Sequence, residues 1–209
     1  MKNKTIWLAT ILCLLPILFG ITVYDSLPER IPTHFDLAGN PNGWSSRPMA
    51  VFGIPMFLAL MNLLCHWVTS RDEKTRKATP KALQGVIYWI VPVISWLVVP
   101  MSLFEGMGAD VPVGFLVSVL IGVMFVVIGN YLPKCKPNYY VGIKLPWTFA
   151  SEENWRKTHR FGGKVWVVCG FLMVIAGIFK LDALLVATLF AAIILPCGYS
   201  WLEFKKEQK

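Results

Sequence analysis

The chain has 209 residues, of which 56% are hydrophobic and only 15% are charged, and its formal net charge is +8. A soluble domain normally carries about a quarter charged residues. Much of the sequence lies in apolar runs close to the length of about 20 residues that spans a bilayer. The composition therefore argues against a soluble globular domain and predicts an all-α integral membrane protein.

Six apolar runs are predicted to be transmembrane helices. In chain order they cover residues 6–24, 49–68, 86–104, 112–132, 165–181 and 183–204. The fifth run is the shortest, and we expect it to continue a helix that begins near Ser151. The tight connection 179–182 predicts that the last two helices are antiparallel neighbours. The predicted fold is a six-helix bundle with a small structured outer loop and an inner loop that contains a short helix.

The distribution of lysine and arginine predicts the orientation of these helices. With the N-terminus inside, 17 of the 20 basic residues fall on the inner side, and only Arg30, Arg47 and Lys180 fall outside. Basic residues concentrate on the cytoplasmic side of membrane proteins. Both termini are therefore predicted to be cytoplasmic. Contact with anionic inner-leaflet lipids accounts for the positive charge, so membrane lipids are expected partners and direct nucleic-acid binding is not.

The outer loop, residues 26–48, has the pattern of a small folded element. Ile31, Thr33 and Phe35 alternate with polar residues, which predicts a short strand. The segment 39–43 is rich in glycine, asparagine and proline and predicts a turn. The loop is either a cap that shields polar helix ends or an outward recognition surface. The recognition surface would comprise His34, Phe35, Asp36, Gly39 and Trp44.

Several residues inside the predicted spans are expected to serve helix packing. Pro16 interrupts the first span, and neighbouring helices can satisfy the backbone groups that a proline frees. Asn62 and His66 lie one turn apart and are expected to hydrogen-bond to adjacent helices. Gly114, Gly122 and Gly129 in the fourth span permit the close helix approach that is common in lipid.

The most distinctive stretch is the polar, aromatic and basic segment 138–160, which separates two long apolar regions. Pro146 predicts a rigid turn, because its ring fixes its own φ and favours an extended preceding residue. Ser151 is a predicted helix N-cap, followed by acidic residues that favour the first turn. Two ion pairs with i,i+4 spacing are expected: Glu152 with Arg156, and Glu153 with Lys157.

This segment also carries a family resemblance. The pattern Gly142-Ile-Lys-x-Pro146-Trp147-Thr148, followed by Trp155 and Thr158-His159-Arg160, resembles the signature of the SdpI family of bacterial integral membrane immunity proteins. That family usually has arginine where this chain has Lys144, and the two cations differ in hydrogen-bond geometry. The resemblance implies a multi-pass protein of the bacterial cytoplasmic membrane. It also implies immunity to a secreted toxin peptide and capture of a cytosolic transcriptional repressor.

A second resemblance lies in the outer loop. The sequence Pro32-Thr-His34-Phe35, followed by Gly39, resembles a small bacterial domain of unknown function that often precedes the SdpI-like region. Two sequence modules are therefore expected. Residues 1–70 form a first helix pair with the outer loop, and residues 71–209 form an SdpI-like four-helix region with a cytoplasmic signature loop at 133–164.

The inner loop is the predicted partner-binding site. Its candidate residues are Asn138, Gly142, Lys144, Pro146, Trp147, Trp155, Arg156, His159 and Arg160. Tryptophan and arginine are enriched at binding hot spots, which favours a docking surface for a cytosolic protein. The same residue types also suit the inner membrane interface, so a purely structural role stays open.

Catalytic chemistry is not expected. The three histidines lie in separate segments, and no hydrolase, metalloprotease or nucleotide-binding motif occurs. No predicted span has an ionisable residue near its centre, which disfavours a proton-coupled pump. No cofactor or metal is expected. Two alternatives to immunity remain: a carrier or channel for a small solute or lipid, lined by Asn62, His66 and Asn130, and a purely structural membrane protein.

Overall fold

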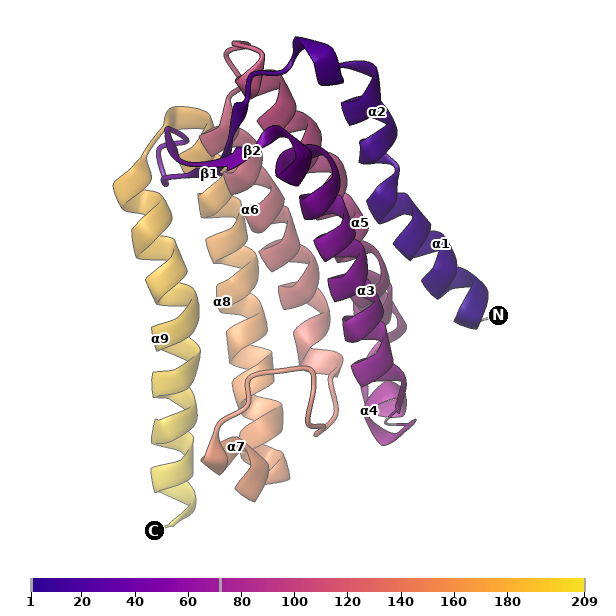
Figure 1. Cartoon of the computed structure of the whole chain (residues 1–209). Helices are drawn as coiled ribbons and strands as arrows, with labels where there is room; N and C mark the ends of the chain where they lie inside the picture. The colour runs from indigo at the N-terminus through magenta and orange to yellow at the C-terminus, as the bar shows by residue number, and fades with distance from the viewer. Residues whose placement is uncertain (1, 72, 209) are drawn as a thin grey trace. The chain divides into compact units, whose positions relative to one another are not determined.

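The computed structural model describes residues 2–71 and 73–208, and helices dominate it (Figure 1). Within these residues, six helices are long and apolar enough to cross a membrane. They are Lys4–Thr22, Met49–Thr69, Lys81–Gly106, Val113–Lys134, Glu152–Phe179 and Asp182–Glu207. They coincide with the six predicted runs, except that the third and fifth begin earlier. The predicted fold class is therefore confirmed, and so is the expectation that the fifth helix begins next to Ser151.

The chain forms two compact units. The first comprises Met1–Arg71 and Gly85–Gly114, and the second comprises Asp72–Gln84 and Phe115–Lys209. The two modules predicted for residues 1–70 and 71–209 were defined by sequence resemblance and not by compactness. This division stays a prediction.

The first unit contains the β-hairpin and the helices around it. Its elements are α1 (Lys2–Leu14), α2 (Pro16–Thr22), a 3-10 turn (Tyr24–Ser26), β1 (Arg30–Phe35), β2 (Pro41–Ser46), a π-helical turn (Met49–Gly53), α3 (Ile54–Arg71) and most of α5 (Lys81–Gly106). Ile31 of β1 is fully buried with Val51 and Leu103. An apolar core therefore holds the start of the hairpin against the helices of its own unit.

Pro16 breaks the first span into α1 and α2. Because proline has no N–H, it leaves the carbonyl of Leu12, four residues earlier, without its helical donor. The indole Nε1 of Trp96 donates to this carbonyl at 3.0 Å, and Ser95 Oγ donates to the carbonyl of Cys13 at 2.8 Å. The expectation that a neighbouring helix satisfies the freed backbone groups is confirmed.

Asn62 and His66 are both buried in α3. Asn62 Nδ2 donates to Thr10 Oγ1 at 2.9 Å, which confirms its expected bond to a neighbouring helix. The same expectation is wrong for His66, because neither of its ring nitrogens has a hydrogen-bond partner. Its ring instead stacks on Tyr88, with 4.7 Å between the ring centroids.

The β-hairpin confirms the strand expected at Ile31, Thr33 and Phe35. β1 pairs antiparallel with β2, and the predicted turn 39–43 is only partly correct. The turn comes earlier, because the Asp36 carboxylate accepts hydrogen bonds from the backbone and side chain of Asn40 at 2.8 and 3.2 Å. Gly39 completes it with φ +90°, while residues 41–43 already belong to β2.

The second unit contains the C-terminal helices. Its elements are α4 (Glu73–Ala78), most of α6 (Val113–Tyr131), a 3-10 turn (Leu132–Lys134), α7 (Pro146–Ala150), α8 (Glu152–Phe179) and α9 (Asp182–Glu207). The sequence did not predict the helix α4, which lies in the connection between the second and third spans. α8 and α9 lie side by side as an antiparallel pair, as expected (Figure 1). Lys180 ends α8 in the left-handed conformation, with φ 52°.

Two pairs of glycines bring α6 and α8 together. A Cβ atom on Gly122 would lie 2.6 Å from the carbonyl oxygen of Gly170, and one on Gly170 would lie 2.5 Å from that of Gly122. Gly129 and Gly163 show the same reciprocal relation, at 2.8 and 2.6 Å. The close helix approach expected from the glycine spacing in the fourth span is confirmed for Gly122 and Gly129, whereas Gly114 lies against the turn of the β-hairpin.

Candidate functional site

The part of the signature loop that precedes α8, residues 135–151, folds around the side chain of Trp155. This indole is 1% exposed, and its Nε1 donates to the carbonyl of Cys135 at 2.9 Å. One face stacks on the ring of His159 with 4.0 Å between ring centroids, and Phe149 lies at 5.5 Å. Trp155 therefore connects the first turns of α8 to both ends of the segment 135–151.

The backbone at Gly142 and Ile143 lies against the ring of His159. The Nε2 atom of His159 accepts a hydrogen bond from the backbone N–H of Ile143 at 2.9 Å. Its Nδ1 lies 2.8 Å from the carbonyl of Trp155, so Nδ1 carries the proton of a neutral ring. Gly142 has φ +125°, and a Cβ atom there would overlap His159 Nε2. Both the backbone conformation and the space available require glycine.

Asn138 and Lys144 fix the path of the signature loop. Asn138 Nδ2 donates to the carbonyls of Lys136 and Val141, and its Oδ1 accepts from the N–H groups of Tyr140 and Val141. The ammonium group of Lys144 lies 3.1 and 3.3 Å from the carbonyls of residues 139 and 140. Asn138 is buried, whereas Lys144 covers the loop from its exposed side.

The predicted turn at Pro146 is the start of α7. Proline stands at the first helical position, where its missing N–H costs nothing. Thr148 Oγ1 accepts from the N–H of Leu145 at 2.9 Å and lies 2.8 Å from the carbonyl of the same residue. Trp147 packs edge-on against Trp201 of α9, with 5.1 Å between ring centroids. The short helix therefore joins the signature loop to the end of α9.

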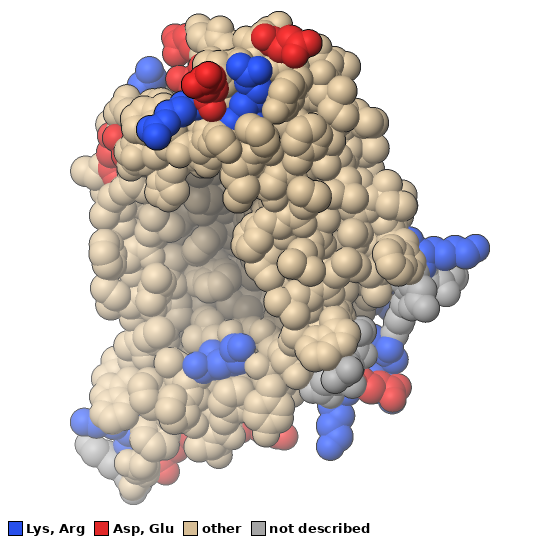
Figure 2. Space-filling model, viewed as in Figure 1, with Lys and Arg blue, Asp and Glu red and all other residues tan. Residues whose placement is uncertain are grey.

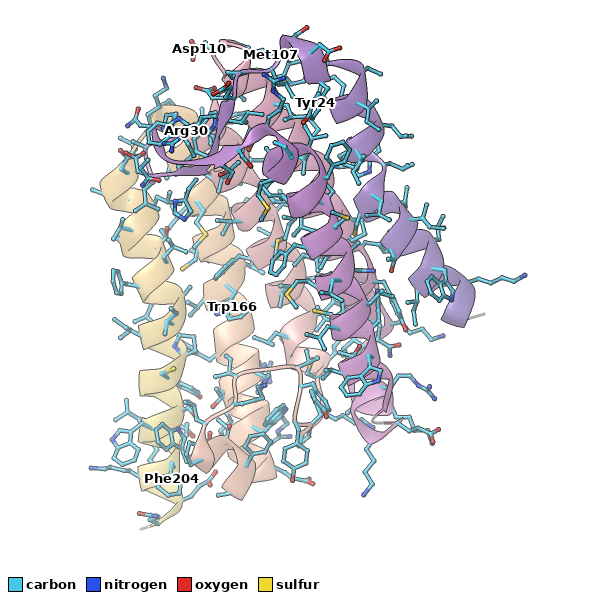
Figure 3. The ribbon with its side chains drawn as sticks, in the orientation of Figure 1. Tyr24, Arg30, Met107, Asp110, Trp166 and Phe204 are labelled. Carbon is cyan, nitrogen blue, oxygen red and sulfur yellow. The ribbon has the colours of Figure 1, made fainter. Side chains whose placement is uncertain are left out.

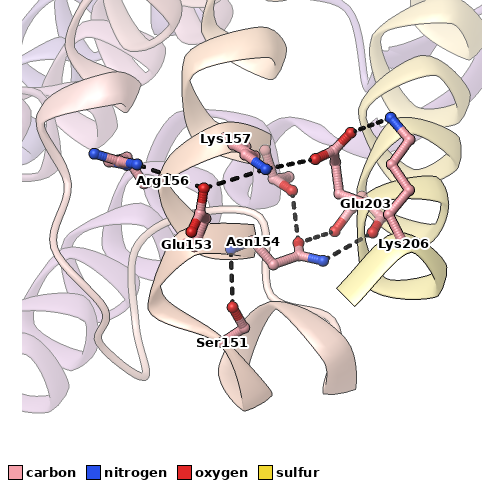
Figure 4. Close-up of polar contacts among 9 residues, drawn as sticks. Ser151, Glu153, Asn154, Arg156, Lys157, Glu203 and Lys206 are labelled. Carbon is pink, nitrogen blue, oxygen red and sulfur yellow. Dashed lines mark hydrogen bonds and ion pairs between the residues drawn. The ribbon is translucent and has the colours of Figure 1, made fainter. Parts of the chain in front are cut away.

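Asn154 connects α8 to α9 through a buried polar cluster (Figure 4). Its Nδ2 donates to the carbonyl of Ser200 at 2.9 Å. Its Oδ1 accepts from the hydroxyls of Ser200 and Thr158 at 2.8 and 2.9 Å. Ser151 caps α8 as predicted, because its Oγ accepts from the N–H of Asn154 at 3.1 Å. Every polar atom of the Asn154 amide side chain thus has a partner at this helix contact.

Charged side chains continue the connection beside this cluster (Figure 4). The Glu203 carboxylate is 7% exposed and lies 2.9 Å from Lys157 and 2.7 Å from Lys206. Lys157 also pairs with Glu153 at 3.2 Å, which confirms one of the two ion pairs expected within α8. The other is wrong, because Arg156 lies against Glu153, at 3.7 Å, and not against Glu152.

The structure divides the predicted residues of the signature loop into two groups. Asn138, Gly142, Trp155 and His159 form its interior, and Trp147 packs on α9. The exposed residues are Lys144, Pro146, Arg156 and Arg160. The assignment of all nine to partner binding stays a prediction. The buried ones can contribute to it only by shaping the loop that carries the exposed ones.

Cys135, at the start of the signature loop, is a structural residue. It is buried, and burial raises the pKa of its thiol to about 11. Nucleophilic and metal-binding chemistry needs a thiolate. Within the described residues, no group of three or more His, Cys, Asp or Glu side chains could hold a metal ion.

The predicted recognition residues of the outer loop all lie on the β-hairpin. His34 and Trp44 are exposed, and His34 Nδ1 lies 2.9 Å from Asn42 Oδ1. Hydrogen bonds from the backbone and side chain of Asn40 hold the pKa of Asp36 below its usual range. Phe35 is only partly exposed, and Gly39 shapes the turn. The recognition role of this surface stays a prediction.

Several residues of the site were not found from the sequence. Asn154, Ser200 and Glu203 form the α8–α9 connection, although α9 contributed no candidate. The signal that could have found them is the presence of Asn154 and Thr158 one turn apart on a helix next to an apolar span. The partner of Asn154 on α9, Ser200, is 46 positions away, so no local pattern connects the two residues.

We expect the Asn154→Ala variant to unfold at a lower temperature than the parent in detergent micelles. The substitution removes three buried side-chain hydrogen bonds and leaves the hydroxyls of Ser200 and Thr158 without their acceptor. Leaving a buried polar group without a partner costs about 1–3 kcal/mol. Asn130→Ala is the matched control, because Asn130 is exposed on α6. Equal melting temperatures for the two variants would contradict this role of Asn154.

Six bilayer-length helices joined by a folded loop and a hairpin define a multi-pass membrane protein. Residues 134–200 match the model of the SdpI/YfhL protein family, and residues 11–59 match DUF1648, a domain of unknown function. The chain is similar to "Immunity protein SdpI" of Bacillus subtilis (strain 168), with 25% identity over 208 residues, 98% of this chain and 97% of that protein. No solved structure matches. These matches agree with the resemblance to the SdpI family that the sequence motifs carry.

Proposed function

We propose that this protein confers immunity to a secreted bacterial killing peptide. The observation that carries the proposal is the likeness to an immunity protein over 98% of the chain. The similarity spans the β-hairpin, the signature loop and all six long helices, so every element of the proposed mechanism lies within it. The protein acts in the bacterial cell membrane, where such a peptide reaches its target.

In this proposal, both termini and the signature loop face the cytoplasm, while the β-hairpin faces outward. The basic residues support the orientation, since 17 of 20 fall on the side of the termini. The hairpin presents the exposed side chains of His34, Asp36 and Trp44 to the peptide. A tryptophan that is 55% exposed in a small folded element is suited to an apolar contact.

The signature loop is proposed to dock a cytosolic transcriptional repressor. Its exposed cations, Lys144, Arg156 and Arg160, lie in or next to the loop that Trp155 and His159 hold in shape. Such a surface suits an acidic patch on the partner. Binding of the peptide can change repressor capture only if it stabilises one conformation of the protein over another.

The protein acts in this proposal without catalysis and without a cofactor. The buried histidine of the site, His159, already uses both ring nitrogens to hold the signature loop. The Cys135 thiol is protonated at neutral pH because burial raises its pKa to about 11. Neither side chain is free to act as a base or a nucleophile.

A killing assay tests the proposal. Sensitive bacteria that express the protein are exposed to secreted peptides encoded beside its relatives, and we expect survival to exceed that of cells with an empty vector. The Trp44→Ala variant should reach the membrane in normal amount and lose protection, because Trp44 is exposed on the hairpin. Equal killing with and without the protein, across the candidate peptides, would refute immunity.

Cysteine labelling in intact cells tests the orientation. Ala150 and Asn42 are exposed residues in the signature loop and the hairpin. A maleimide that does not cross membranes should label an Asn42→Cys variant and leave Ala150→Cys unlabelled until the cells are lysed. The parent protein, with its five free cysteines, gives the background signal. Labelling of Ala150→Cys before lysis would reverse the proposed sides.

A further inference from the structure

The second unit has a groove between α8 and α9 with a volume of about 430 Å³. Figure 2 shows that the surface along α9 is almost entirely tan between the charged side chains at its two ends. The lining consists of two facing stripes with four-residue spacing: Lys164, Val168 and Leu172 on α8, and Ala187, Ala191 and Leu195 on α9. The two stripes line an open apolar groove with one charged residue, Lys164.

Lys164 has no partner within the part of the chain that the structure describes. Its ammonium group makes no hydrogen bond or ion pair, and the carboxylate of Glu203 on the facing helix is already held by Lys157 and Lys206. The other polar group in the lining, the hydroxyl of Thr188, lies 2.8 Å from a backbone carbonyl of its own helix. The groove therefore offers one unpaired positive charge beside an apolar surface.

The depth of Lys164 along α8 places it near a membrane boundary. It precedes the last residue of α8, Phe179, by 15 positions, which corresponds to about 22 Å of helix. The hydrocarbon core of a bilayer is about 30 Å thick. If the α8–α9 connection marks one boundary, Lys164 lies about 8 Å from the other, within reach of the headgroup region for a long side chain.

A cation at this depth is costly unless it reaches the interface or meets an anion. Basic pockets between transmembrane helices bind the headgroups of anionic lipids. From Lys164 the apolar stripe of α8 continues to Leu172, about 12 Å toward the α8–α9 connection. An acyl chain needs no hydrogen-bond partners along this lining, whereas an extended peptide would need partners that the lining lacks.

We propose that the α8–α9 groove binds an anionic phospholipid of the surrounding membrane. The phosphate pairs with the ammonium group of Lys164, and one acyl chain lies between the stripes of Val168 and Ala191. Trp166 holds α8 against α9 next to the groove, because its Nε1 donates to the carbonyl of Ala192 at 2.8 Å (Figure 3). The site is independent of immunity and of the cytosolic partner.

Native mass spectrometry of the full-length protein tests the proposal with two lipids that share their acyl chains, phosphatidylglycerol and phosphatidylcholine. Both headgroups carry a phosphate, but choline cancels its charge in phosphatidylcholine. The net negative charge of phosphatidylglycerol beside one lysine corresponds to a preference of about fivefold. The Lys164→Gln variant should bind both lipids equally, and Lys164→Arg should keep the preference. Lys136→Gln is the charge-matched control, because Lys136 is an exposed loop residue outside the groove, and this variant should also keep the preference.

An Ala187→Trp variant tests the acyl-chain part, because Ala187 is an exposed residue that lines the groove. It should lower the binding of both lipids. Equal binding of the two lipids by the parent protein would overturn the proposal. The same loss of preference in Lys136→Gln as in Lys164→Gln would also overturn it, because the effect would then reflect net charge alone. Unchanged lipid binding by Ala187→Trp would place the acyl chain elsewhere and overturn the groove assignment.

Discussion

Replacing Gly142 by alanine should disrupt the signature loop and lower the folding stability of the protein. The residue has φ +125°, and holding a non-glycine residue in such a conformation costs about 1–3 kcal/mol. The new methyl group would also displace the His159 ring, which loses its hydrogen bond from Ile143. That loss adds about 1 kcal/mol or more. Thermal unfolding in detergent micelles, followed by circular dichroism, measures the effect.

Gly198→Ala is the matched control for this prediction. Gly198 lies inside α9 of the same unit, and a Cβ atom there would meet no other atom within 4 Å. Alanine in place of glycine inside a helix is favourable by about 0.5–1 kcal/mol. The control variant should therefore unfold at the parent temperature or above it. If Gly142→Ala behaved in the same way, the proposed fit of Gly142 against His159 would be wrong.

Replacing Trp155 by alanine should have the largest effect of any single substitution in the site. The indole is 1% exposed, and removal of a buried tryptophan side chain costs about 3–5 kcal/mol. The variant also loses the hydrogen bond to the Cys135 carbonyl and the stacking partner of His159. We expect a strongly reduced yield of folded protein in the membrane. Fluorescence-detected gel filtration of a fusion protein measures it.

Two further variants separate the causes of this effect. Trp155→Phe keeps an aromatic ring and lacks the Nε1 donor, so it should recover part of the yield. Trp44→Ala removes a tryptophan that is 55% exposed and should change stability by less than about 0.5 kcal/mol. A normal yield for Trp155→Ala would show that the signature loop does not depend on this side chain.

Much of the architecture could be predicted because bilayer length and helical spacing are local properties of the sequence. The six spans, the cap at Ser151 and the close approach at Gly122 and Gly129 all follow from patterns of this kind. The break at Pro16 could be anticipated as well, although the sequence did not show that Trp96 would supply the missing donor.

The parts that could not be predicted depend on residues far apart in the chain. Asn154 meets Ser200, and Lys157 meets Glu203, only because α9 returns along α8. The hairpin turn was placed too late, because the pattern of glycine and proline at 39–43 outweighed the carboxylate of Asp36. Within the signature loop, composition identified the aromatic residues without showing that Trp155 faces inward and Arg160 outward.

The reciprocal glycine contacts between α6 and α8 restrict how this unit can change shape. Gly122 and Gly170, like Gly129 and Gly163, meet backbone to backbone, so a sliding step of one residue would drive a side chain into a carbonyl oxygen. Translation of α6 along the axis of α8 is therefore blocked. Within this unit, a conformational change that transmits a signal across the bilayer must therefore rotate α6 and α8 together or move α9 relative to them.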